Sequence, residues 1–95
     1  LYPEYGGSCI RPPGVAVVRD NRIDGNVIRK QRTGIEFGLG RTGTTVYKNY
    51  ARYNQLHDDV VGMHFRMDAV SNGGTTNDYT GTATPAIDEN GFNSH

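Results

Sequence analysis

A segment of twenty residues occurs twice in this chain, and no other feature limits the fold as strongly. Residues 18–37 (VRDNRIDGNVIRKQRTGIEF) align without a gap with residues 46–65 (VYKNYARYNQLHDDVVGMHF). Five of the twenty paired positions are identical, where average composition predicts roughly one. The identical pairs are Val18 and Val46, Asn21 and Asn49, Asn26 and Asn54, Gly34 and Gly62, and Phe37 and Phe65. A fixed period of about 20 to 50 residues is typical of a solenoid, in which each repeat buries its apolar face against the next.

The order of residues within each repeat indicates short strands rather than helices. Asn21 and Ile23 are two residues apart, as are Ile35 and Phe37, and strand side chains two residues apart share a face. The turn dipeptide Asp24-Gly25 and a polar loop at 29–34 separate these pairs. Each 28-residue unit is therefore expected to contain three short strands and three bends.

Stacking the two units in register places Asn49 on Asn21 and Asn54 on Asn26, at the strand spacing of about 4.8 Å. Side-chain amides at that spacing can form a ladder of hydrogen bonds along the stack. The alternative is that asparagine is simply a common turn residue. Both pairs lie in one ungapped register, which favours the ladder.

These residues resemble a known family. The pattern N-x-I-x-G-N-x-I at 21–28, followed by a loop and G-I-x-F at 34–37, is similar to one rung of a right-handed parallel β-helix of the pectate-lyase-like type. The resemblance covers about residues 15–68. Families that share this architecture include polysaccharide lyases, glycoside hydrolases, uronate epimerases, phage tailspikes and adhesins.

The predicted fold is thus an all-β right-handed parallel β-helix in a single domain, residues 1–95. Coils are expected at about 18–45 and 46–73, with 74–95 forming a loop and a partial coil in which Gly91 takes the place of Gly62. The Gly- and Thr-rich run at 71–84 is expected to leave the stack as a long loop. Open strand edges above and below would need further coils or other chains stacked on them, so the sequence indicates a segment of a longer β-helix or an assembly. The alternative fold is an antiparallel sandwich in which the repeat is accidental.

Charge is distributed unevenly along the chain and limits the class of partner. Residues 1–52 hold nine basic and four acidic residues, a net charge of +5, and residues 53–95 hold one and six, a net charge of −5. A chain with no overall basic excess is a poor nucleic-acid binder. Cys9 is the only cysteine, so an intrachain disulfide is excluded, and no apolar run reaches the roughly 18 residues of a membrane span.

A catalytic site is predicted on the outer face of the strands that contain Phe37 and Phe65. If the phenylalanines point inward, Glu36 lies beneath His64 on the outside, and Arg66 and Asp68 follow on the same face. Glycines at 38 and 40 on the lower rung are expected beneath Arg66 and Asp68 respectively, leaving room for a ligand. The alternative is a solvated face of ordinary charged residues.

The resemblance implies a mechanism for such a site. In β-helix lyases and epimerases an Arg or Lys neutralises a uronate carboxylate while a His, Lys, Tyr or Arg removes the C5 proton. In this chain His64 would be the general base or acid, Arg66 the clamp for the carboxylate, and Glu36 or Asp68 the partner.

Three weaker sets of residues suit binding. Tyr47, Tyr50 and Tyr53 could form a platform on which sugars stack, or be ordinary sheet-surface residues. The acid pair Asp58-Asp59 after His57 is of the kind inverting glycosidases use, although adjacent strand residues face opposite ways. Hard oxygen ligands that suit Ca²⁺ are present, but their spacing fits no EF-hand, so no cofactor is expected and Ca²⁺ is the alternative; these ligands are Asp78, Asp88, Glu89 and Asn90.

The function expected from these features is engagement of an acidic polysaccharide at the cell exterior or a virion surface, with lyase, epimerase or hydrolase activity as the implied reactions. The rival expectation is a non-catalytic rod, such as a spike, adhesin or fibre segment, whose task is stacking and recognition.

Overall fold

The computed structural model describes residues 16–40 and 44–95, and in these residues the fold is all-β, with short parallel strands and no helix. Cys9 lies outside the described residues. The strands are β1 (Ala16–Arg19), β2 (Arg22–Asp24), β3 (Val27–Arg29), β4 (Thr33–Phe37), β5 (Thr44–Tyr47), β6 (Tyr50–Arg52), β7 (Gln55–His57), β8 (Val61–Phe65), β9 (Ala69–Val70), β10 (Gly73–Thr75) and β11 (Thr84–Asp88).

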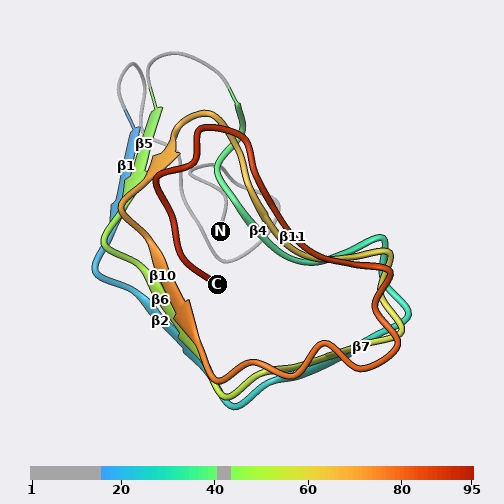
Figure 1. Ribbon diagram of the computed structural model, residues 1–95. Helices are drawn as coiled ribbons and strands as arrows, with labels where there is room; N and C mark the ends of the chain where they lie inside the picture. The colour runs from blue at the N-terminus through green and yellow to red at the C-terminus, as the bar shows by residue number, and fades with distance from the viewer. Residues whose placement is uncertain (1–15, 41–43) are drawn as a thin grey trace.

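No strand pairs with the next strand along the chain; each described strand pairs with the strand that occupies the same place one turn of the chain earlier or later. Four parallel sheets result, with the strand orders β1-β5-β9, β2-β6-β10, β3-β7 and β4-β8-β11. We call β1–β4 the first circuit, β5–β8 the second and β9–β11 the third; Figure 1 shows each circuit lying on the one before it. Every pairing between described strands is parallel, so the antiparallel sandwich is wrong.

The first two circuits pair in the register that the sequence repeat predicts. Val18 pairs with Val46 and Phe37 with Phe65, as in the alignment of the two segments. The third circuit lies on the second in a shorter register, as Val46 pairs with Ala69 and Met63 with Ala86. The shortening occurs at one place, because Phe37 precedes Val46 by nine positions, whereas Phe65 precedes Ala69 by only four.

The third circuit departs from the expected loop and partial coil. The prediction that 71–84 leaves the stack is wrong, because Gly73–Thr75 forms β10 on β6 and Asp78 bridges to Gln55. Gly91 does not take the place of Gly62, since β11 pairs Thr84 with Val61 and so sets residue 85 beside Gly62. The assumption of a constant period failed because the connection between β8 and β9 is shorter than the one between β4 and β5.

Asparagine ladders run through the corners of the circuits, as predicted. Asn21 Nδ2 donates to Asn49 Oδ1 at 3.0 Å, and Asn49 Nδ2 donates to Asn72 Oδ1 at 3.0 Å. At the next corner Asn26 donates to Asn54 and Asn54 to Asn77, each at 3.0 Å. A buried amide needs partners for both its donors and its acceptor, and for Asn49 the stacked amides of Asn21 and Asn72 together with the backbone carbonyl of Val18 supply them.

A third corner is linked in the same way, since the N–H of Gln31 donates to Asp59 Oδ1 and the N–H of Asp59 donates to Thr82 Oγ1. Each linked residue of the three corners follows a residue in the left-handed backbone region. The φ angles of these preceding residues lie between 52° and 74° in all three circuits, and the residues are Asp20, Gly25, Lys30, Lys48, Tyr53, Asp58, Ser71, Thr76 and Gly81. The positive φ turns the chain sharply between strands. Most of these positions are not glycine and so carry conformational strain.

Thr76 allows this strain to be measured, because it is β-branched at φ 55°. Thr76→Gly is expected to raise the free energy of unfolding by about 0.5 to 1 kcal/mol, since the strain it removes exceeds the chain entropy it adds. The matched control is Thr75→Gly in β10, which should lower stability by about 0.5 to 1 kcal/mol because glycine weakens a strand. Urea denaturation of both variants checks this, and equal destabilisation by the two changes would contradict it.

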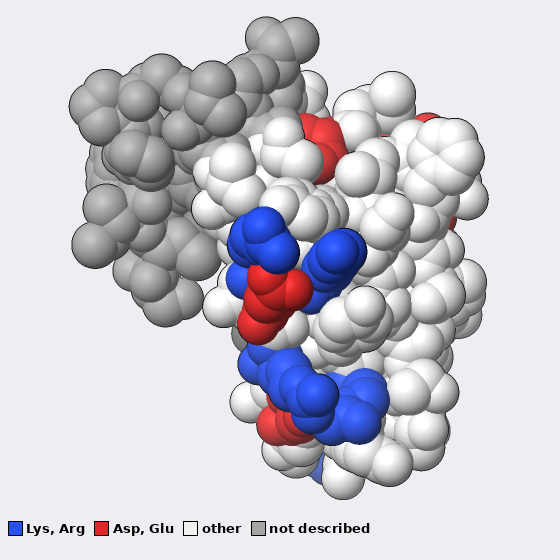
Figure 2. All heavy atoms as spheres, turned by 90° about the vertical axis from the view of Figure 1, so that its left-hand side faces the viewer, with Lys and Arg blue, Asp and Glu red and all other residues white. Residues whose placement is uncertain are grey.

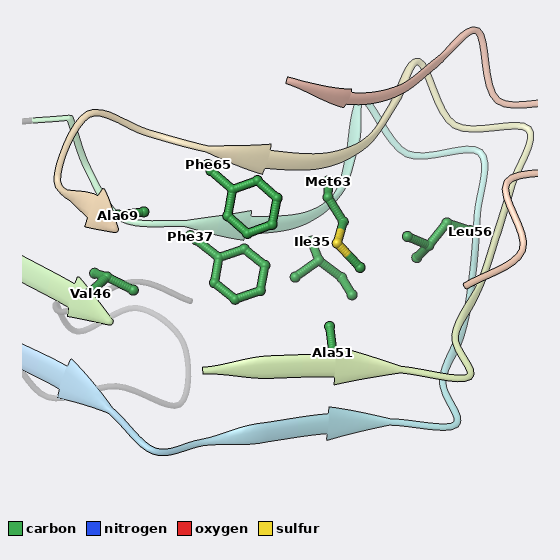
Figure 3. Close-up of a cluster of buried hydrophobic side chains, with 8 residues drawn as sticks. All are labelled: Ile35, Phe37, Val46, Ala51, Leu56, Met63, Phe65 and Ala69. Carbon is green, nitrogen blue, oxygen red and sulfur yellow. The ribbon is translucent and has the colours of Figure 1, made fainter. Parts of the chain in front are cut away.

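The apolar core lies between the sheets and is centred on the second circuit, which is covered on both sides (Figure 3). The rings of Phe37 and Phe65 stack with centroids 4.6 Å apart, and Asp88 of the third circuit is the register partner of Phe65. The aromatic column thus ends at a carboxylate. The buried apolar residues are Ile35, Phe37, Val46, Ala51, Leu56, Met63, Phe65 and Ala69.

Candidate functional site

The outer face of the sheet β4-β8-β11 holds the predicted catalytic residues. Glu36 and His64 are register partners, as expected from the repeat. Their side chains nevertheless do not pair with each other. His64 Nε2 lies 2.6 Å from Glu89 Oε2, in the third circuit, so Glu89 is a member of the cluster that the sequence analysis missed in this role.

Arg66 lies between two carboxylates. Its Nη1 is 3.5 Å from Glu36 Oε1 and its Nε is 3.0 Å from Glu89 Oε2, although the angle at Nε is not that of a hydrogen bond. A sugar carboxylate would have to compete with these two acids for the guanidinium. The cluster of Glu36, His64, Arg66 and Glu89 therefore acts first as an ionic link between the three circuits.

Asp68 binds the loop after β4. Its carboxylate accepts hydrogen bonds from the N–H of Leu39 at 3.1 Å and of Gly40 at 2.7 Å. The expected positions of the two glycines are reversed, because a Cβ on Gly38 would meet the Asp68 carboxylate and one on Gly40 would meet the Arg66 guanidinium. The chain turns at these glycines, with φ of 91° and 74°, rather than continuing as a strand. Asp68 thus holds the loop in place.

The three tyrosines do not form one platform. Tyr47 is in β5 with the Arg19 guanidinium 5.0 Å from its ring centre, and Tyr53 is at the corner after β6 with the Arg52 guanidinium at 5.8 Å. Tyr50 begins β6 on a different sheet and is 46% exposed. Tyr50 lines two hollows on the part of the surface that the structure describes.

The outer face of β2-β6-β10 carries this hollowed surface. Arg22, Tyr50 and Gly73 are register partners in successive circuits, so they form one column across the sheet. A hollow of about 200 Å³ is lined by Tyr50 with Arg22 and Arg52. A second hollow of about 180 Å³ lies on the side of the third circuit and is lined by Tyr50, Arg52, Gly73, Gly74, Thr75 and Ser94. We call these the basic hollow and the neutral hollow.

Charge on this face belongs to the first two circuits. Figure 2 shows the Lys and Arg side chains gathered around a few acidic ones, while the part of the face contributed by the third circuit is white. Arg52 is paired with Asp24, with Nη2 at 3.1 Å from Oδ2, and hydrogen bonding to Arg52 lowers the pKa of Asp24. Arg22 makes no ion pair with any residue that the structure describes. The charge of Arg22 also helps to lower the pKa of Asp24, but no carboxylate of a described residue lies within ion-pair distance of Arg22, so the basic hollow offers this guanidinium beside an exposed aromatic ring.

The acid pair at the third corner is split between two environments. Asp59 is 2% exposed and accepts a hydrogen bond from the N–H of Gln31, so it is a ladder residue. Asp58, the residue before it, is exposed and has a left-handed backbone conformation. The two carboxyl groups therefore do not face a common substrate, as expected for adjacent residues.

The oxygen ligands considered for Ca²⁺ are engaged elsewhere. Asp78 accepts hydrogen bonds from Thr80 and lies 3.0 Å from His57 Nε2, and these contacts, Thr80 first, lower the pKa of Asp78. Within 16–40 and 44–95, no group of three or more His, Cys, Asp or Glu residues is placed to hold a metal ion. Asp88 instead binds Asn93 and the N–H of Gly91.

The Asp88 contacts give a pH dependence. Burial alone would raise the pKa of Asp88, but hydrogen bonds donated by Asn93 and Gly91 outweigh burial and leave it below its ordinary value. The stability due to Asp88 is then fully present above the unfolded pKa of about 3.9 and is lost as pH falls through the lower folded pKa. The difference in free energy of unfolding between wild type and Asp88→Asn should shrink from pH 6 to pH 2.5. A difference that stays constant or grows on acidification would contradict this.

Comparison with protein-family models, curated proteins and solved structures finds no match to this chain. Among the residues that the structure describes, no helix has the length and apolar character needed to cross a membrane.

Proposed function

We propose that this chain is part of a right-handed parallel β-helix that binds an acidic polysaccharide at the cell exterior or a virion surface. Support for the β-helix comes from parallel pairing in register between successive circuits, which joins all three circuits in three sheets and the first two circuits in the fourth sheet, β3-β7. The right hand follows from the strong preference of parallel strand connections for that hand. The binding surface is the outer face of β2-β6-β10, and the ligand is a chain of sugars that carry carboxylates.

The observation that carries the binding proposal is the basic hollow beside Tyr50. An exposed aromatic ring offers an apolar face for a sugar ring, and the Arg22 guanidinium suits a carboxylate, which it can bind through two parallel hydrogen bonds. By contrast, the Arg66 guanidinium on the other candidate surface already lies beside Glu36 and Glu89.

Calorimetric titration with alginate and with polygalacturonate tests this assignment. Tyr50→Ala and Arg22→Ala should each weaken binding about tenfold, which corresponds to about 1.4 kcal/mol. Arg29→Ala, which removes an exposed Arg from β3 in the same circuit, is the matched control and should change binding less than twofold. Binding that is unaffected by both hollow variants would overturn the proposal.

Gly73→Ala provides a second test that removes no binding group. A methyl at this position would stand 2.8 Å from Cδ1 of Tyr50, so the ring must move from its place over the third circuit. We expect weaker binding with both uronans while the circular dichroism spectrum stays that of the parent protein. Unchanged affinity in the folded variant would mean that the position of the ring is irrelevant to binding.

Catalysis at His64 is a second candidate function, favoured by its 2.6 Å contact with Glu89, because a carboxylate can orient an imidazole for proton transfer. Release of unsaturated or reducing ends from alginate and pectate would be lost in His64→Ala and Arg66→Ala. A parent protein without turnover on these uronans, or unchanged rates in both variants, would leave only the non-catalytic alternative, a recognition rod. That alternative is supported by Ser94, whose N–H donates to the carbonyl of Asn72 as the chain begins another layer over the third circuit.

A further inference from the structure

The two hollows beside Tyr50 differ in chemistry. The basic hollow has two arginines and a ring as its walls, whereas two glycines, a threonine and a serine make up most of the neutral hollow. Their volumes, about 200 and 180 Å³, are similar. The surface therefore offers two compartments of like size and unlike charge.

Arg52 borders both hollows, but its guanidinium is paired with Asp24 of the first circuit. Its Nη2 lies 3.1 Å from Asp24 Oδ2 and its Nε lies 3.5 Å from Asp24 Oδ1. The register partner of Arg52 in the third circuit is Thr75, which is uncharged. The guanidinium charge of Arg52 is therefore largely compensated, and Arg22 is left as the cation available to a ligand.

The direction of a bound chain follows from the column Arg22, Tyr50 and Gly73. These residues succeed one another at the strand spacing of about 4.8 Å, so the ends of the column are about 10 Å apart. Tyr50 leans over Gly73, which has no side chain to obstruct it. A ligand that contacts both hollows must run along the stacking direction, across the strands, and pass the tyrosine ring.

Resting on the proposed function, we propose that this surface takes a polysaccharide in which a uronate sugar neighbours an uncharged sugar. The uronate occupies the basic hollow with its carboxylate on Arg22, and the uncharged sugar occupies the neutral hollow against Thr75 and Ser94. A second carboxylate in the neutral hollow would gain no charged partner of its own, because Arg52 is already paired with Asp24. The surface thus discriminates between alternating and homogeneous uronans.

Competition between two defined oligosaccharides of equal length tests the discrimination. One alternates glucuronate with N-acetylglucosamine, and the other is oligogalacturonate, which carries a carboxylate on every sugar. At fixed ionic strength we expect the alternating oligosaccharide to bind at least fivefold more tightly, although it carries half the charge. Equal or tighter binding of oligogalacturonate would overturn the inference.

Thr75→Lys reverses the chemistry of the neutral hollow and gives a second readout. The added ammonium should raise the affinity for oligogalacturonate at least fivefold more than the affinity for the alternating oligosaccharide. Gln55→Lys, at an exposed position on β7, is the control for added charge and should affect both ligands alike. The same gain from both lysine variants would also overturn the inference.

The outcomes separate this inference from the proposed function. If the parent protein binds neither oligosaccharide and neither uronan polymer, the proposed function itself fails. If it binds both oligosaccharides equally and Tyr50→Ala weakens both, the proposed function stands and the two unlike hollows are refuted.

Discussion

Phe65→Ala is expected to lower the free energy of unfolding by about 3 to 5 kcal/mol, the usual cost of removing a buried aromatic side chain. Phe65 is fully buried and stacks on Phe37 with the ring planes 21° apart. The cavity would open beside the ring of Phe37, and the methyl group of alanine cannot fill it. A domain of this size has about 5 to 15 kcal/mol of stability in total, so the variant should be close to unfolding at about 37 °C.

Phe92→Ala is the matched control, because the Phe92 ring is 70% exposed. Its effect should lie within about 0.5 kcal/mol of zero. Urea denaturation followed by circular dichroism measures both variants. Similar stabilities for the two variants would show that the aromatic column is not part of the core.

Asn49→Ala is expected to cost about 3 kcal/mol or more, through unsatisfied polar groups rather than lost apolar contact. The Asn49 side chain is fully buried and donates to the carbonyl of Val18 and to the side chain of Asn72, while accepting from Asn21. Each buried group left without a partner costs about 1 to 3 kcal/mol.

Asn21→Ala is the control for the ladder, since Asn21 is exposed at the first circuit. After this change Asn49 Oδ1 still accepts the N–H of residue 21, so the loss should stay below about 1 kcal/mol. The pair is compared by chemical denaturation at neutral pH. Equal losses of unfolding free energy in Asn49→Ala and Asn21→Ala would contradict this account, because the buried ladder residue would then contribute no more than the exposed one.

The pairing of the first two circuits could be predicted because their residues repeat without a gap. Ile35 pairs with Met63 and Ile28 with Leu56, as the alignment indicates, and the asparagines stack. Inward positions in parallel strands must match in every circuit, so the same residue types recur there. The strand register between the first two circuits can therefore be predicted from the sequence repeat.

The third circuit could not be found with a constant period. A loop outside the core can be shortened without changing any stacked strand, and the loop after β8 is shorter than its counterpart after β4. The usable signal was the spacing between ladder residues, since Asn21 and Asn26, Asn49 and Asn54, and Asn72 and Asn77 are all separated by the same number of positions. That spacing is fixed by one short strand and its corner, whatever the length of the loop.

The candidate sites were predicted less completely than the fold. The sequence placed Glu36 beside His64, as observed. It could not show that Glu89 would contact the His64 imidazole, because Glu89 reaches the cluster only through the shortened register of the third circuit. Tyr50 was selected as a sugar-binding residue, yet its neighbour in the column, Gly73, lay in the run that was expected to leave the stack. The wrong register expected for the third circuit thus hid both Glu89 as the partner of His64 and the neutral hollow beside Gly73.

The central claim, that the third circuit lies on the second in a shortened register, is tested most directly by nuclear magnetic resonance. In isotopically labelled protein, nuclear Overhauser effects between backbone protons should join Met63 to Ala86 and Val46 to Ala69, the register partners across the parallel strands. Effects that instead join Gly62 to Gly91, as the partial coil expected from the sequence would require, or an antiparallel pattern between these segments, would contradict the fold and the surface built on it.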